Sequence, residues 1–144
     1  MGLPSDTPNS CPTCCSVVTW GDAGSGGNST AVRGLLTDVW DIYATSVAFA
    51  AVKIDGSVVT WGHPLCGGDS IAVQEQLTDV QCIYSALDAF AALKADGRVV
   101  TWGDAEYGGD STAVQKQLTH VQYICTAGAS FAAASHLVVH LQAR

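Results

Sequence analysis

Short apolar runs alternate with glycine- and aspartate-containing segments along this chain. Val80–Tyr84 alternates and ends in β-branched and aromatic residues, a pattern typical of a strand. Ala89–Lys94 and Val99–Trp102 are further apolar runs and predict a second and a third strand. Asp96-Gly97 lies between these two runs and predicts a two-residue hairpin turn, because both central positions of such a turn tolerate positive φ.

The third of these strands is apolar on both faces. Val99 and Thr101 lie on one face, and Val100 and Trp102 lie on the other. A sheet with one solvated face alternates more cleanly between apolar and polar residues. The pattern therefore predicts a sheet that is covered on both sides, and the alanines of Phe90-Ala91-Ala92 let neighbouring sheets approach closely.

A connector follows the third strand. Gly108-Gly109-Asp110-Ser111 predicts a turn, and its last two residues are suited to cap a short helix. Val114 and Leu118 are spaced i,i+4, which gives one apolar side to about two helical turns. A short irregular strand is the alternative for this segment.

The same order of features recurs with a period of 41 residues. The pentapeptide Val-Val-Thr-Trp-Gly occurs at Val17–Gly21, Val58–Gly62 and Val99–Gly103. A period in this range indicates a solenoid, a propeller or a trefoil. Such a unit cannot bury its apolar face alone, so it stacks on copies of itself or on a partner. The repeat therefore points to binding or structure rather than to catalysis.

The repeat divides the chain into three parts. Residues 1–16 are a polar lead-in with cysteines and prolines, residues 17–134 are an array of three repeats, and residues 135–144 are a degenerate closing strand and tail. One way to close the array is to pair Val17–Trp20 beside Val138–Leu141, which would form a ring.

Composition narrows the class of partner. Charged residues make up 13% of the chain, about half the usual share, and hydrophobic residues make up 48%. The net charge is −7 and the six basic residues are scattered, which argues against nucleic-acid binding by phosphate neutralisation. No apolar stretch reaches the length of a membrane-spanning helix. The first residues show neither a secretory signal nor a transit peptide.

The six cysteines do not recur with the repeat; Cys66, for example, aligns with Ser25 and Tyr107. We therefore expect them to be buried small hydrophobic residues rather than a disulfide framework. A reducing, intracellular location follows, either the cytosol or an organelle such as a plastid.

The segment Phe90–Gly103, with the Val-x-x-Ile of Val80–Ile83 before it, resembles the repeat of the regulator of chromosome condensation family. The resemblance covers Val17 to about Ala133. It implies an all-β fold in which three tandem repeats form a blade-like partial propeller with short helical connectors. The Gly-Gly-Asp-Ser connector and the shorter period depart from the family pattern, and three repeats are fewer than the usual seven blades. A β-trefoil-like threefold fold is the alternative, although the tryptophans lack the Gln-x-Trp signature of many trefoils.

The shortened arrays of many dinoflagellate proteins are similar to this chain. That similarity makes a photosynthetic membrane complex one specific host, to which the chain would attach peripherally. The family's own propellers mediate protein contacts, including nucleotide exchange on a small GTPase, so a regulatory fragment acting on a GTPase or in ubiquitin transfer is one alternative. A trefoil-like lectin is another.

Residues that suggest chemistry have simpler explanations. Cys11 and Cys14 form a C-x-x-C motif, but a structural zinc site needs four ligands and no second pair lies at a suitable spacing. His136 and His140 lie in a Val-Val context that favours a strand over a helical ligand pair. The acidic residues beside glycines are interpreted as turn formers, and the three periodic tryptophans as core. We expect no cofactor, no metal and no catalytic site.

The candidate binding surface is where the units differ. Residues 22–25, 63–66 and 104–107 occupy the same loop but have unrelated sequences, and a constant scaffold with variable loops is typical of binding surfaces. The predicted partner-binding residues are His63, Pro64, Leu65, Cys66, Glu106 and Tyr107. The sequence thus predicts a non-catalytic protein-interaction module, an accessory or stabilising subunit of a larger assembly.

Overall fold

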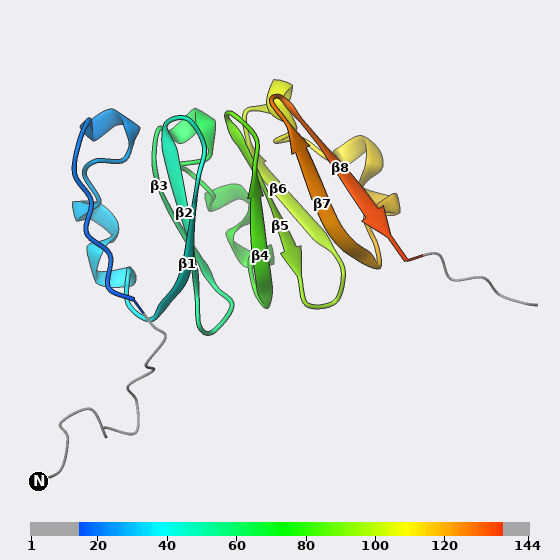
Figure 1. The fold of residues 1–144 in the computed structure, drawn as a ribbon, viewed down its shortest axis with the longest axis horizontal. Coiled ribbons are helices and arrows are strands. Elements are labelled where there is room, and N and C mark those ends of the chain that lie inside the picture. The colour runs from blue at the N-terminus through cyan, green and yellow to red at the C-terminus, as the bar shows by residue number, and fades with distance from the viewer. Residues whose placement is uncertain (1–14, 137–144) are drawn as a thin grey trace, which may run out of the picture.

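The computed structural model describes residues 15–136, which form eight strands in three antiparallel sheets and six short 3₁₀ helices (Figure 1). The first sheet contains β1 (Val39–Ala44), β2 (Ala48–Lys53) and β3 (Val58–Gly62). The second contains β4 (Val80–Ser85), β5 (Ala89–Lys94) and β6 (Val99–Gly103), and the third contains β7 (Val121–Ala127) and β8 (Ser130–Ser135). The helices are η1 (Ala23–Ser25), η2 (Thr30–Leu35), η3 (Pro64–Cys66), η4 (Ile71–Gln76), η5 (Ala105–Tyr107) and η6 (Thr112–Gln117). The all-β class is confirmed, and so are the three predicted strands between residues 80 and 102.

The sheets lie side by side in a row, with their faces in contact (Figure 1). The core between the first and second sheets includes Ala50, Val52, Ile83 and Phe90, each at most 2% exposed. A second core between the second and third sheets includes Leu93. Small side chains in the middle strands allow this close approach, as the sequence predicted.

Each Phe–Trp pair rests on a glycine turn of the preceding unit. Trp102 Nε1 donates a hydrogen bond to the carbonyl of Gly67 at 3.0 Å, and its ring lies 5.3 Å from that of Phe90. Gly67 has a φ of +105°, and a Cβ there would lie 2.5 Å from the Phe90 ring. Trp61 makes the same bond to Gly26 at 3.0 Å. The glycine is required because the aromatic ring occupies the place of a side chain.

Backbone hydrogen bonds join the sheets at both edges of the row. At one edge, here called the upper edge, Ser46 N donates to Leu87 O at 2.7 Å and Leu87 N donates to Gly128 O at 2.8 Å. At the opposite, lower edge, Val80 N donates to Gly56 O at 3.0 Å, and Val121 N donates to Gly97 O at 2.9 Å. Each of these bonds links residues of successive units, so the sheets are held in register by backbone as well as by side chains.

The Asp-Gly pairs lie at hairpin tips, as predicted, but the turn differs from the expected one. Gly56 and Gly97 have φ of +82° and +84°, whereas Asp55 and Asp96 are absent from the residues with positive φ. Each aspartate instead accepts a hydrogen bond from the amide two residues later, Asp55 from Ser57 N at 2.9 Å. The side chain thus supports the turn locally, and only the glycine supplies the left-handed conformation.

The connectors are helical, in the 3₁₀ form. Ser70 precedes η4, and its hydroxyl pairs with that of Thr60 at 2.9 Å. Gln74 Nε2 donates to Val58 O at 2.9 Å and ties the helix to β3. Leu77, 1% exposed, ends the connector in the core.

One prediction about the first unit, the burial of Trp20, is wrong. Trp20 is 84% exposed, while Trp61 and Trp102 are each 5% exposed and lie in the core as expected. The reason is that no glycine turn among the described residues lies in front of Trp20 to cover its ring. Val17–Trp20 forms no strand, and it lies at the end of the row opposite to β8 (Figure 1). Val138–Leu141 lies outside the described residues.

The expectation of buried cysteines is also wrong. Cys15 and Cys125 are exposed, and Cys66 and Cys82 are half-buried. They occupy positions where other units place glycine, serine, tyrosine or aspartate, residue types that do not define a small apolar pocket. Cys11, Cys14 and His140 lie outside the described residues, and the possible zinc and histidine pairs involving them are not described by the structure.

Candidate functional site

The variable loops of the three units form η1, η3 and η5, which stand in a row along the upper edge (Figure 1). The loops of η3 and η5 are built by the same local rules, whereas Asp22, which precedes η1, makes no side-chain cap hydrogen bond. A glycine with positive φ ends the preceding strand, as at Gly62 with a φ of +106°. The next residue caps the helix: His63 Nδ1 accepts from Leu65 N at 3.2 Å, and Asp104 Oδ1 accepts from Glu106 N at 2.9 Å. The frame is therefore set by backbone and caps, which leaves the loop tips free to vary.

The predicted partner-binding residues lie on two neighbouring loops of this row. His63, Pro64 and Leu65 are exposed, with Leu65 at 73%, and Cys66 is half-buried. In the next loop, Glu106 is exposed and Tyr107 is half-buried. The two loops belong to adjacent units, so their tips lie along the same edge rather than converging in a pocket.

The turns between the first two strands of each sheet anchor the loops. His63 N donates to Val47 O at 2.9 Å, and Asp104 N donates to Asp88 O at 2.9 Å. The Thr45 hydroxyl donates to Cys66 O at 3.0 Å. Asp88 also accepts a hydrogen bond from the Ser46 hydroxyl of the previous unit. These bonds fix the position of each loop relative to the next.

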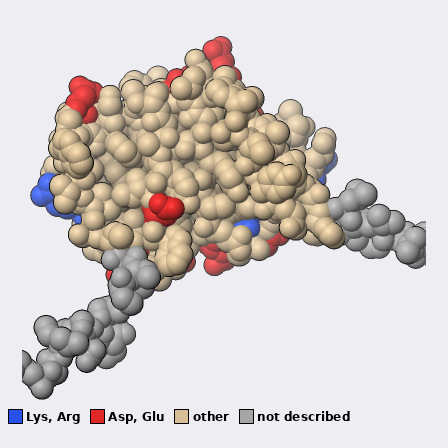
Figure 2. Space-filling model, in the orientation of Figure 1, with Lys and Arg blue, Asp and Glu red and all other residues tan. Residues whose placement is uncertain are grey.

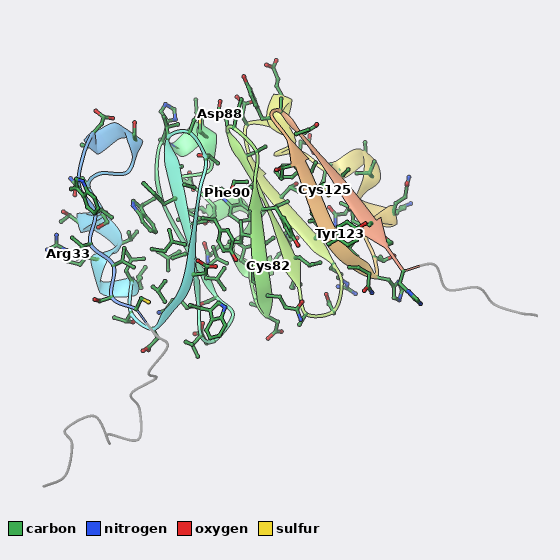
Figure 3. The ribbon with its side chains drawn as sticks, viewed as in Figure 1. Arg33, Cys82, Asp88, Phe90, Tyr123 and Cys125 are labelled. Carbon is green, nitrogen blue, oxygen red and sulfur yellow. The ribbon has the colours of Figure 1, made fainter. Side chains whose placement is uncertain are left out.

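On this edge, the thiol of Cys66 lies near the carboxylates of Asp88 and Asp104. Burial raises the pKa of the Cys66 thiol, and the negative charges of Asp88 and Asp104 raise the pKa further. The thiol is therefore protonated at neutral pH and is a poor nucleophile. Asp88 stands at the upper edge in Figure 3. This environment suits an apolar or hydrogen-bonding contact rather than thiolate chemistry.

Sequence reasoning missed one member of the row. Leu87 lies in the β4–β5 turn and is 53% exposed, although both its backbone N–H and its C=O bond to neighbouring units. It is equivalent to Ser46 and Gly128 in the other units. The variation at this position, in a turn that recurs in each unit, could have identified Leu87 as a candidate binding residue. With Leu65, it adds a second large apolar side chain to the upper edge.

Most of the acidic side chains seen in Figure 2 lie at the edges of the molecule, and charged side chains are few on the face between them. At the starts of η4 and η6, Asp69 and Asp110 accept hydrogen bonds from Ile71 N and Thr112 N, each at 3.0 Å. Within residues 15–136, no group of three or more His, Cys, Asp or Glu side chains could hold a metal ion. No helix in this described part is long and apolar enough to cross a bilayer.

No protein-family model matches the chain, and no curated protein matches it.

Proposed function

We propose that this chain is a non-catalytic protein-interaction module that serves as an accessory or stabilising subunit of a larger assembly. The observation that carries the proposal is Leu65, which is 73% exposed at the tip of a loop whose two flanking left-handed glycines recur in every unit. The fold gains nothing from an exposed leucine there, since the equivalent residue in the next unit is Glu106. An exposed apolar tip on a constant scaffold is suited to binding another protein.

The arrangement of the sheets supports a propeller-type array over a trefoil. Three small antiparallel sheets pack face to face in a row, joined by connectors that leave the upper edge and return to the lower edge. The resemblance to the regulator of chromosome condensation repeat points to the same type of array. Propellers of this kind present their loops to protein partners, and the row of η1, η3 and η5 would be the equivalent surface here.

The host of the proposed subunit follows from the resemblance to dinoflagellate arrays. It favours a photosynthetic membrane complex, with this chain attached at its periphery. The chain's low charge, and the few charged side chains on the face seen in Figure 2, are compatible with a surface that other subunits cover.

The test is to compare two charged variants of the full chain. Native purification of the tagged wild-type protein identifies the partner, and the purified partner is then titrated against each variant. Leu65→Asp places a charge that must be desolvated on docking, so affinity should fall about tenfold or more. Ile71→Asp is the matched control, because Ile71 is an equally exposed aliphatic residue at 82% in η4, outside the row of loop tips.

Loss of affinity in Leu65→Asp alone supports the proposal. Equal affinity of both variants and the wild type would show that the upper-edge loops are not the contact surface.

A further inference from the structure

Among residues 15–136, the two ends of the row lack complementary parts of a three-stranded sheet. Inside the row, every three-stranded sheet offers a middle strand and a third strand with a tryptophan, and the tryptophan lies on a glycine turn of the preceding unit. The first unit has the third-strand segment, Val17–Gly21, but its own residues 7–12 align with β5 as Thr-Pro-Asn-Ser-Cys-Pro. Proline has no N–H to donate to a sheet ladder, so that sequence is unsuited to a middle strand.

The segment Val17–Gly21 therefore presents what we call the head surface, made of Val18, Trp20 and Ile42. Val18 is 78% exposed and Trp20 is 84% exposed. Ile42 is 38% exposed, whereas its equivalents Ile83 and Ile124 are 2% and 5% exposed because a preceding sheet covers them. A cleft of about 200 Å³ separates Val17–Trp20 from Ile42 and Phe49.

The opposite end presents the tail surface, made of Gly108, Phe131 and Ala133. The third sheet has two strands among the described residues, and a cleft of about 230 Å³ lies beside β8, lined by these three residues together with Val99, Thr101 and Leu118. Ala133 is exposed, although its equivalent Ala92 is 0% exposed. Within residues 15–136, no tryptophan donates to the carbonyl of Gly108 as Trp61 and Trp102 do to the equivalent carbonyls.

Within the described part of the chain, the outer edge of β8 pairs with no strand. In β5 the backbone of Lys94 points toward the third strand, since Lys94 N donates to Arg98 O at 2.9 Å. By the same alternation, Phe131 and Ala133 direct their backbone groups to the open edge of β8. The chain's own residues 140–144, which align with that third strand, read His-Leu-Gln-Ala-Arg and so lack both the tryptophan and the glycine of the motif.

We propose that the head surface of one copy of this chain docks on the tail surface of a second copy, with Val17–Gly21 added to β8 as the third strand of its sheet. The register follows from the β5–β6 pairing, in which Phe90 is opposite Trp102 and Ala92 is opposite Val100. In the docked pair Trp20 lies opposite Phe131, Val18 lies opposite Ala133, and Trp20 Nε1 donates to the carbonyl of Gly108.

This contact covers the exposed residues of both ends, and Val17–Gly21 has the sequence of the strand that the third sheet lacks among the described residues. Val17–Gly21 has the same five residues as β3 and β6, which occupy the equivalent place in the other two sheets. The addition of a strand to an exposed sheet edge supplies main-chain hydrogen bonds, and Trp20 entering the cleft supplies specificity. Because head and tail are different surfaces, the interface is heterologous, and copies assemble into a closed ring or into an open filament.

The first experiment measures self-association by sedimentation velocity over a range of concentrations. The wild-type chain should form species larger than a monomer, in proportions that depend on concentration. Trp20→Ala should remain monomeric, with an unchanged far-UV spectrum and melting temperature, because an 84% exposed side chain contributes little to the fold. Trp40→Ala is the matched control, since Trp40 is 54% exposed but lies outside the head surface, and it should associate like the wild type.

The second experiment tests the polarity of the contact. Ala133→Glu places a charge on the tail surface at a residue that is exposed in the single chain, so it should block the tail without unfolding the protein. Each of Trp20→Ala and Ala133→Glu should be monomeric alone, yet an equimolar mixture should form a 1:1 dimer. In that dimer the intact head of the Ala133→Glu chain occupies the intact tail of the Trp20→Ala chain.

A wild-type chain that stays monomeric at all concentrations would overturn the proposal, as would equal loss of association in Trp40→Ala and Trp20→Ala. A mixture that fails to dimerise would show that head and tail do not meet. These outcomes are separate from the proposed partner binding, because Leu65→Asp alters neither surface and should self-associate like the wild type.

Discussion

Gly67 offers the sharpest test of how one unit rests on the next. Its φ is +105°, and a Cβ at this position would lie 2.5 Å from Cδ2 and 2.6 Å from Cε2 of Phe90. Phe90 is 0% exposed and its ring packs at a tilt of 32° against that of Trp102, so it has little free space into which to move. Gly67→Ala therefore forces either a shift of the glycine turn or a displacement of the Phe–Trp pair.

The expected loss of stability in Gly67→Ala is the sum of two costs, less one smaller gain. A left-handed conformation costs an alanine about 1–2 kcal/mol, and the insertion of a methyl group into a packed core costs about 1–3 kcal/mol. Reduced freedom of the unfolded chain returns about 0.4–1 kcal/mol. The free energy of unfolding should fall by about 1–4.5 kcal/mol, which for a chain of this size lowers Tm by roughly 3–15 °C.

Urea denaturation followed by tryptophan fluorescence measures the loss, with Gly34→Ala as the control. A Cβ on Gly34 meets nothing within 4 Å, and Gly34 has no positive φ, so this variant should be as stable as the wild type or slightly more stable. In a double-mutant cycle, Phe90→Ala should cost less in the Gly67→Ala background than alone, by about 1 kcal/mol or more. Equal stability of Gly67→Ala and Gly34→Ala would refute the Phe90–Gly67 contact.

Three further predictions test other contacts. Trp102→Phe keeps a ring but removes the hydrogen bond to the buried carbonyl of Gly67, so the free energy of unfolding should fall by about 1–3 kcal/mol. Trp20→Phe should change the free energy of unfolding little, because Trp20 is exposed. Chemical denaturation at low protein concentration compares the two variants. Gly97→Val should reduce the free energy of unfolding by about 2 kcal/mol or more, because φ is +84° and a Cβ would lie 2.9 Å from His120 Cα. Calorimetry should show a lower melting temperature, and an unchanged one would contradict the hairpin contact. Burial, with the nearby charge of Asp41, raises the pKa of Tyr43 to about 12 from its usual 10.0. The folded protein therefore binds the phenolic proton more tightly than the unfolded chain, so this contribution to stability is complete below pH 10 and is lost between pH 10 and 12; the urea midpoint should fall less over this range in Tyr43→Phe than in the wild type.

The strands and the hairpin tips were predictable because their signals are local. Alternation of apolar residues defines Val80–Tyr84, and a glycine after an aspartate defines the tip at Gly97. The 41-residue period likewise placed the variable loops in equivalent positions. In the structure they form one row on the upper edge.

The remaining features depend on what lies beside each unit. Trp20 has the same local sequence as Trp61, but its exposure is decided by the absence of a covering turn among the described residues. The bonds through Ser46 and Leu87 use backbone atoms, so no side-chain type marks them. Positive φ at Asp79 and His120 was missed for a similar reason, since each lies under the glycine tip of the preceding hairpin. The period and the composition identify the repeating unit, whereas the contacts between units can be identified only in the three-dimensional structure.

Residue-resolved amide hydrogen exchange tests the central claim, that successive units stack with their edges joined by backbone hydrogen bonds. The informative amides are those of Ser46 and Leu87, which lie in turns at the upper edge and bond only to residues of other units. At low protein concentration, both should exchange on the order of a hundredfold or more slowly than in an unstructured peptide, at rates close to those of the β2 and β5 strand amides. Exchange of both amides at unstructured rates, while the strand amides stay protected, would show that the sheets form but do not stack as described.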